Sequence, residues 1–244
     1  MGMWRFWSLC AGAAVAGLSL APTAGATPVT AHDRAAPALT ARVVLPTTAY
    51  GAPRWGARRV MSLRGATTWT GSAQRLLVTG RHTDVAGRDW VRVQLPIRPN
   101  GTAGWVRANR VRLSGTRVRF EVHLGSRRLE IWRGGRLVHR FAAGIGRPGT
   151  PTPVGRFAIQ DPVPTVPGWR SVYGAWTLTL TAHSNVLMKF MGGDGLVAIH
   201  GTGTGRGWRV GQPSSNGCVI LAEPELAVAA RYARAGTPVV IDRS

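Results

Sequence analysis

Two residue types that together carry acyl-transfer chemistry stand close together in the C-terminal half of the sequence. His200 follows the short apolar run 197–199, and Cys218 comes eighteen positions after it, behind the segment Ser-Ser-Asn-Gly. An imidazole beside a thiol can promote thiolate formation and later return the proton to a leaving group. A single cysteine is also often a small buried apolar residue, so the pair alone leaves a structural role open.

The local sequence predicts how both side chains are held. The apolar run indicates a buried strand that ends at His200, and the Asn216-Gly217 pair indicates a turn that presents Cys218 on an exposed corner. Gly217 has no side chain to obstruct the sulfur. Backbone N–H groups of such a turn can face the oxygen that becomes negative when a thiolate attacks a carbonyl.

The His-Gly-Thr block at 200–202 and the Ser-x-Gly-Cys block at 215–218 resemble the signature of the L,D-transpeptidase (YkuD-like) catalytic domain. The resemblance covers residues 117–242, about half of the chain. It includes the Thr-Pro-x-Gly-x-Phe segment at 152–157, the Tyr-Gly-Ala-Trp segment at 173–176 and the Ala-His-Ser segment at 182–184. Several matches in the same order are more specific than any single motif.

The resemblance implies a role for each matching residue. Cys218 is the nucleophile and His200 its base, and no metal or organic cofactor is needed. The oxyanion and orienting positions fall on Gly201, Ser215, Asn216 and Gly217, with the Gly201 carbonyl orienting the imidazole. The substrate-binding positions fall on Tyr173, Trp176 and His183.

Two residues depart from the family pattern. Asn216 stands where the family most often has histidine, and Ile220 stands where an arginine or asparagine commonly follows the cysteine. Asn216 keeps its backbone N–H and a hydrogen-bonding side chain, whereas Ile220 cannot pair with a substrate carboxylate. We therefore expect these departures to affect substrate affinity or range more than the chemistry.

The N-terminus has the pattern of a signal peptide over residues 1–26. A basic start precedes an apolar stretch from Leu9 to Leu20, and Ala24-Gly25-Ala26 forms a small-residue cleavage site. The apolar stretch is short for a membrane span, so a cleaved export signal is the simplest interpretation and a retained anchor is the alternative. Cleavage would remove Cys10, leave Cys218 as the sole thiol and leave no integral membrane span. The predicted location is the cell wall or the extracytoplasmic space.

The chain is strongly basic, with 31 Lys and Arg against 10 Asp and Glu and a formal net charge of +21. The basic residues are scattered through both halves, and the signal exports the chain, so we expect no nucleic-acid partner. Anionic cell-wall polymers or a membrane surface would match the charge, and a merely solvated arginine-rich surface explains it equally well. No cluster of His, Cys and carboxylates has metal-ligand spacing, so no metal site is predicted.

The predicted fold class is mainly β, with a small SH3-like barrel followed by a β-rich catalytic domain with a short C-terminal helix. Residues 27–40 are rich in Ala, Thr and Pro and indicate a flexible linker. Residues 41–114 carry short strands at 75–79, 89–95, 104–106 and 111–113, and their Gly-Trp-Val segment resembles a bacterial SH3-like domain. Such a domain would be either a wall-binding module or a rigid spacer. Residues 117–242 predict a hairpin over 129–138, a helix over 224–235 and a closing strand over 238–241.

Three functions remain open at this point. The resemblance implies a transpeptidase that cross-links the third residues of peptidoglycan stem peptides through a Cys218 thioester and releases D-alanine. Water as the acceptor would make the enzyme an L,D-carboxypeptidase, and loss of activity would leave a cell-wall-binding protein. A papain-like hydrolase is disfavoured, because there the cysteine precedes the histidine by a long interval.

Overall fold

The computed structural model describes residue 30 and residues 35–204 and 207–244. The predicted signal peptide and most of the predicted linker lie outside these residues. The linker prediction extends too far, because a strand already begins at Ala38. The described chain is mainly β with short helices, as predicted, and none of its helices in these ranges is long and apolar enough to cross a membrane.

The N-terminal unit is an antiparallel seven-stranded sheet in the order β3-β2-β6-β5-β4-β1-β7. Its apolar core includes the buried side chains Val43, Leu63, Val93 and Val106. The strands predicted at 75–79, 89–95, 104–106 and 111–113 correspond to β4 to β7, and the SH3-like assignment stays a prediction. The elements are β1 (Ala38–Val43), β2 (Thr47–Tyr50), β3 (Arg59–Leu63), β4 (Arg75–Thr83), β5 (Asp89–Gln94), β6 (Ala103–Arg107), η1 (Ala108–Arg110) and β7 (Val111–Thr116).

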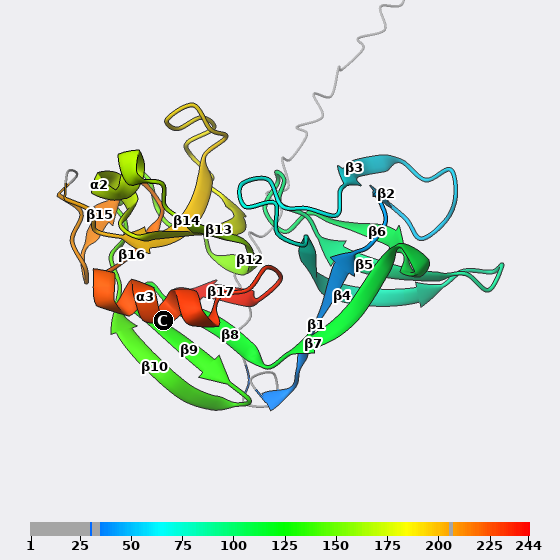
Figure 1. Ribbon diagram of the computed structural model, residues 1–244, viewed down its shortest axis with the longest axis horizontal. Coiled ribbons are helices and arrows are strands. Elements are labelled where there is room, and N and C mark those ends of the chain that lie inside the picture. The colour runs from blue at the N-terminus through cyan, green and yellow to red at the C-terminus, as the bar shows by residue number, and fades with distance from the viewer. Residues whose placement is uncertain (1–29, 31–34, 205–206) are drawn as a thin grey trace, which may run out of the picture.

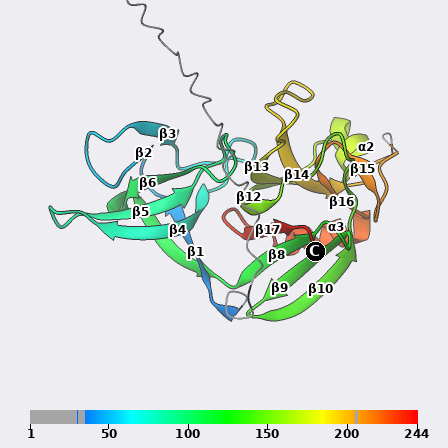
Figure 2. The same ribbon diagram turned by 180° about the vertical axis from the view of Figure 1, so that it is seen from behind.

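The C-terminal unit is built on an eight-stranded sheet in the order β10-β9-β8-β17-β12-β13-β14-β16, with a separate parallel pair β11-β15. In Figures 1 and 2 the two units form adjacent lobes that the chain joins through β7 and β8. The elements are β8 (Val118–His123), β9 (Arg128–Arg133), β10 (Arg136–Ala142), β11 (Ile145–Gly146), β12 (Gly155–Pro164), η2 (Pro167–Trp169), α2 (Arg170–Tyr173), β13 (Trp176–His183), β14 (Leu196–Gly201), β15 (Pro213–Ser215), β16 (Val219–Leu221), α3 (Glu223–Tyr232) and β17 (Pro238–Asp242).

Local sequence explains the hairpin and the last helix. β9 and β10 pair antiparallel around Gly134 and Gly135, whose φ angles of 59° and 80° suit a tight hairpin turn that glycine adopts without strain. α3 carries Pro224 in its first turn and buries Leu226 and Ala229. The helix ends at Tyr232, three residues earlier than predicted, because the chain then turns through a bond from the Thr237 amide to the Arg234 carbonyl.

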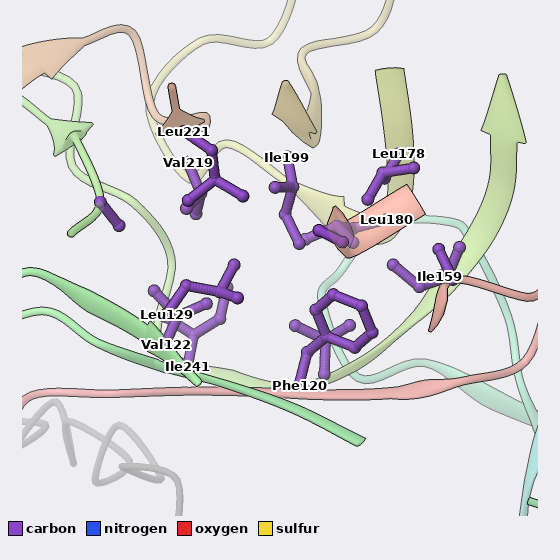
Figure 3. Packing of buried hydrophobic residues seen from close by; sticks show 14 of the residues in the cluster. Phe120, Val122, Leu129, Ile159, Leu178, Leu180, Ile199, Val219, Leu221 and Ile241 are labelled. Atoms are coloured by element: carbon purple, nitrogen blue, oxygen red, sulfur yellow. The ribbon is translucent and has the colours of Figure 1, made fainter. Parts of the chain in front are cut away.

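One apolar core fixes the strands that carry the candidate site. Figure 3 shows side chains of β8 and β9, such as Phe120 and Leu129, pointing toward Leu180, Ile199 and Val219 from the opposite strands. All five side chains are fully buried, and burial of one such side chain stabilises the fold by about 1.5–3 kcal/mol. Ile199 and Val219 therefore anchor β14 and β16 directly beside His200 and Cys218.

Candidate active site

The parallel pairing of β14 with β16 brings His200 and Cys218 to one place. Ile199 pairs with Val219 and His200 with Ile220, so Cys218 stands just before the strand that lies beside the histidine. Both side chains line the same small cavity. The predicted strand ending near His200 is confirmed, and a bend at 216–217 precedes Cys218. Cys218 is only partly exposed, so the predicted exposed corner is wrong.

His200 is completely buried, and its surroundings fix which ring nitrogen can act as a base. Nδ1 lies 2.8 Å from the Gly201 carbonyl oxygen. A carbonyl only accepts hydrogen bonds, so Nδ1 carries the proton and donates, and Nε2 of the neutral ring keeps its lone pair. Nε2 is buried and has no hydrogen-bond partner among the residues that the structure describes. The rings of Tyr173 and Trp208 pack on the imidazole, with centroids 5.0 and 4.8 Å away.

Burial sets the protonation of both groups. It lowers the pKa of His200 to about 4, although the bond to the Gly201 carbonyl opposes this. Cys218 is partly exposed as a residue, but its thiol is desolvated. Burial raises the pKa of the thiol to about 11, although a backbone hydrogen bond from Ala198 acts in the opposite direction. At neutral pH the site therefore holds a neutral thiol and a neutral imidazole, not a preformed ion pair.

The turn before Cys218 is held by Ser215. The buried Ser215 hydroxyl donates to the Cys218 carbonyl at 2.6 Å and accepts from the Gly217 amide at 3.1 Å. Gly217 has a φ of 116°, which favours glycine. Because the Gly217 amide is already bonded to Ser215, its predicted role as an oxyanion donor is not supported. The Asn216 side-chain oxygen accepts a hydrogen bond from Arg147.

Cys218 lies where two cavities meet. The smaller cavity is lined by Tyr173, Ser184, His200 and Trp208 among others. The larger one has a volume of about 460 Å³, and its wall includes Trp69 and Ala198. The described residues that line the larger cavity include no Asp, Glu, Lys, Arg or His, although the chain is strongly basic. This cavity therefore suits an uncharged part of a ligand.

The three residues predicted to bind substrate have different positions. Tyr173 lines both cavities. Trp176 instead packs against the hydrophobic core, and His183 is only 1% exposed, lines neither cavity and bonds to the Asp194 carboxylate at 3.0 Å. Neither residue lines a cavity beside Cys218, and their substrate-binding roles stay predictions. The end of β13 is buried on both faces, so the alternation of side chains does not tell which of them faces the cavity.

Ile220 pairs with His200 across β14 and β16 but lines neither cavity. Its side chain is fully buried, and its backbone forms two hydrogen bonds of 2.8 Å with Gly144. A larger polar residue at this position would replace a fully buried apolar side chain. The expected effect of Ile220 on substrate binding is thus not supported.

Glu223 was not indicated by the sequence pattern, although it supports the site from the start of α3. Its Oε2 accepts the Ala175 amide at 3.1 Å. A Cβ atom added at Gly174 or Gly201 would come within 2.1 or 2.0 Å of its Oε1. The carboxylate therefore packs against the glycines beside Tyr173 and His200. Only its place directly before the predicted helix 224–235 could have drawn attention to it.

One group in the described ranges has the donor types of a metal site, which sequence spacing did not indicate. Donor atoms of Glu121, His123 and Glu130 lie within 4.8 Å of one another. Glu130 already accepts hydrogen bonds from Arg140 at 2.7 Å and Trp132 at 3.0 Å. Burial raises the pKa of Glu130, but the bond from Arg140 and the charge of His123 outweigh this and hold it below its usual value. We interpret the group as an ion-pair network.

The fold and the paired thiol and imidazole point to a cysteine-dependent acyl-transfer domain. Residues 117–241 match the L,D-transpeptidase catalytic domain, the family named YkuD, over more than half of the 244 residues. The chain belongs to this family. Members of this family act on the stem peptides of peptidoglycan.

The chain is similar to several solved structures. A Bdellovibrio bacteriovorus protein is 25% identical with a TM-score of 0.40, and the match covers 52% of this chain and 48% of that one. An L,D-transpeptidase from Mycobacterium tuberculosis is 15% identical with a TM-score of 0.45, over 83% and 93% of the two chains. One from Mycobacterium smegmatis is 15% identical with a TM-score of 0.39, over 67% and 97%. Among curated proteins, none matches the chain.

Proposed function

We propose that the chain is an exported L,D-transpeptidase that joins the third residues of two peptidoglycan stem peptides. The observation that carries this proposal is the Cys218 thiol in one cavity with the buried, unpartnered Nε2 of His200. The signal-peptide pattern of residues 1–26 supports export to the cell wall. The N-terminal sheet would then be an SH3-like unit, and the excess of arginine would suit anionic wall polymers.

The proposed reaction has two halves. The Cys218 sulfur attacks the carbonyl between the third residue of a donor tetrapeptide and its terminal D-alanine, while Nε2 of His200 takes the thiol proton. The C–N bond breaks, His200 returns the proton to the amine of the leaving D-alanine, and a thioester remains. The side-chain amine of another third residue then attacks the thioester and His200 removes its proton. The carbon–sulfur bond breaks as the cross-link forms, and His200 passes the proton to the sulfur, which restores the thiol.

The protonation states favour proton transfer during attack. The pKa of His200 is lowered to about 4 and the pKa of Cys218 is raised to about 11, so the empty site does not hold the thiolate. Proton transfer would therefore accompany formation of the sulfur–carbon bond. With the Gly217 amide bonded to Ser215, the main-chain amides of Asn216 and Cys218 are the candidate oxyanion donors of the turn.

Incubation of the purified protein with tetrapeptide-containing muropeptides tests the proposal by mass spectrometry. We expect the wild type to release D-alanine and to form a cross-linked dimer. Cys218→Ala should form neither product, and His200→Ala should form both much more slowly. Release of D-alanine without a dimer would instead identify an L,D-carboxypeptidase. If neither product forms although Cys218 still reacts with a thiol reagent, the chain is an inactive wall-binding relative.

A further inference from the structure

The loop between β13 and β14, residues 184–195, forms a wall of both cavities beside Cys218. Ser184 and Leu187 line the smaller cavity, and Phe190 and Gly195 line both. Figure 1 shows this gold segment projecting from the ends of its two strands. The position of the loop therefore decides the shape of the site.

Side chains of the N-terminal unit hold this loop. The Arg98 guanidinium donates to the carbonyls of Ser184, Leu187 at 3.0 Å and Asp194 at 2.7 Å, so it binds both ends of the loop. Its fixed fork of five donors suits such a set of carbonyls. Asn100 donates to the His183 carbonyl at 2.7 Å and accepts the His183 amide at 2.8 Å. Both residues lie in the connection between β5 and β6.

A second segment of the N-terminal unit reaches the larger cavity. The Thr70 hydroxyl and amide bond to the fully buried Asp161 carboxylate at 2.7 and 3.1 Å, and the Trp69 amide lies 3.3 Å from it. This anchor fixes the loop between β3 and β4 against β12, as both ribbon views show. The Trp69 side chain, 49% exposed, lines the same cavity as Cys218.

We propose that the N-terminal unit completes the active site and is more than a wall-binding module or spacer. Arg98 and Asn100 are positioning residues for the loop 184–195. Trp69 contributes a substrate-binding surface, on which an uncharged part of the stem peptide or its attached sugar packs. The substrate-binding role of Trp69 rests on the proposed function. The positioning of the loop 184–195 rests on the hydrogen bonds alone.

Hydrogen exchange tests the loop without any activity measurement. Arg98→Gln removes the guanidinium, and we expect amides of residues 184–195 to exchange about tenfold faster or more, as befits the loss of charged hydrogen bonds. Arg110→Gln is the matched control, because Arg110 is an exposed arginine of the same unit and lines neither cavity. Equal exchange of this loop in both variants would overturn the positioning role.

Kinetics on a tetrapeptide donor test Trp69. Trp69→Ala should raise KM roughly three- to tenfold, the loss of about one aromatic contact, while kcat and alkylation of Cys218 by iodoacetamide stay within about twofold. Trp55→Ala is the control, because Trp55 is 54% exposed and lines neither cavity. Unchanged KM in Trp69→Ala, or an equal rise in the control, would overturn the binding role. A wild-type protein that never acts on the donor would refute the proposed function and the role of Trp69, and the exchange result would still decide the role of Arg98.

Discussion

Burial of His200 predicts a loss of stability in mild acid that can be measured. The folded protein lowers the pKa of this imidazole from 6.5 to about 4. Between these values the unfolded chain binds more protons than the folded one, so the stabilisation is complete above pH 6.5 and falls as the pH falls toward 4. For a single site, the loss between pH 7.5 and pH 5.0 is about 2 kcal/mol, and it approaches about 3 kcal/mol below pH 4.

Urea unfolding of the wild type and of His200→Gln at pH 7.5 and 5.0 isolates this contribution. Every other titrating group is common to both proteins, so their effects cancel in the difference. The wild type should lose about 2 kcal/mol more than the variant over this interval. Equal losses would mean that the imidazole protonates freely in the folded state, and would refute the desolvated environment on which the assigned base depends.

Three further changes follow from the same geometry. Ile220→Arg should destabilise the protein by about 3 kcal/mol or more in urea unfolding, since it buries an unpaired charge. Ile220→Val should destabilise it by only about 1 kcal/mol. Similar values for both variants would place the side chain at the surface. Alkylation of Cys218 should still accelerate above pH 9, because its pKa is raised to about 11, and a plateau by pH 7 would show the opposite shift. Gly201→Ala should lower the thermal midpoint because the new Cβ would lie 2.0 Å from the Glu223 carboxylate, whereas Gly149→Ala, which meets nothing within 4 Å, should not.

Much of the fold follows from local patterns that the sequence states directly. The Gly134-Gly135 pair between two apolar runs predicts the β9–β10 hairpin, and the spacing of Leu226 and Ala229 predicts the buried face of α3. The strand before His200 was predictable for a similar reason, because a short apolar run indicates a buried strand.

The rest depends on contacts between residues far apart in the chain. Trp69 and Asp161 are 92 positions apart, and no short-range pattern indicates that they meet. His183 lies at the end of a strand that is buried on both faces, so residue type alone did not show that its side chain lies away from both cavities. The neutral state of Cys218 was also not predictable, because the desolvation that raises its pKa exists only in the folded protein.

Peptide mass spectrometry shows whether Cys218 carries the acyl group. The purified protein is incubated with a tetrapeptide donor that lacks an acceptor amine, quenched in acid and digested. We expect an adduct of the donor minus D-alanine on the peptide that contains Cys218, absent from Cys218→Ala and much reduced in His200→Ala. Full turnover of the donor without an adduct at this cysteine, or with equal activity in Cys218→Ala, would contradict it.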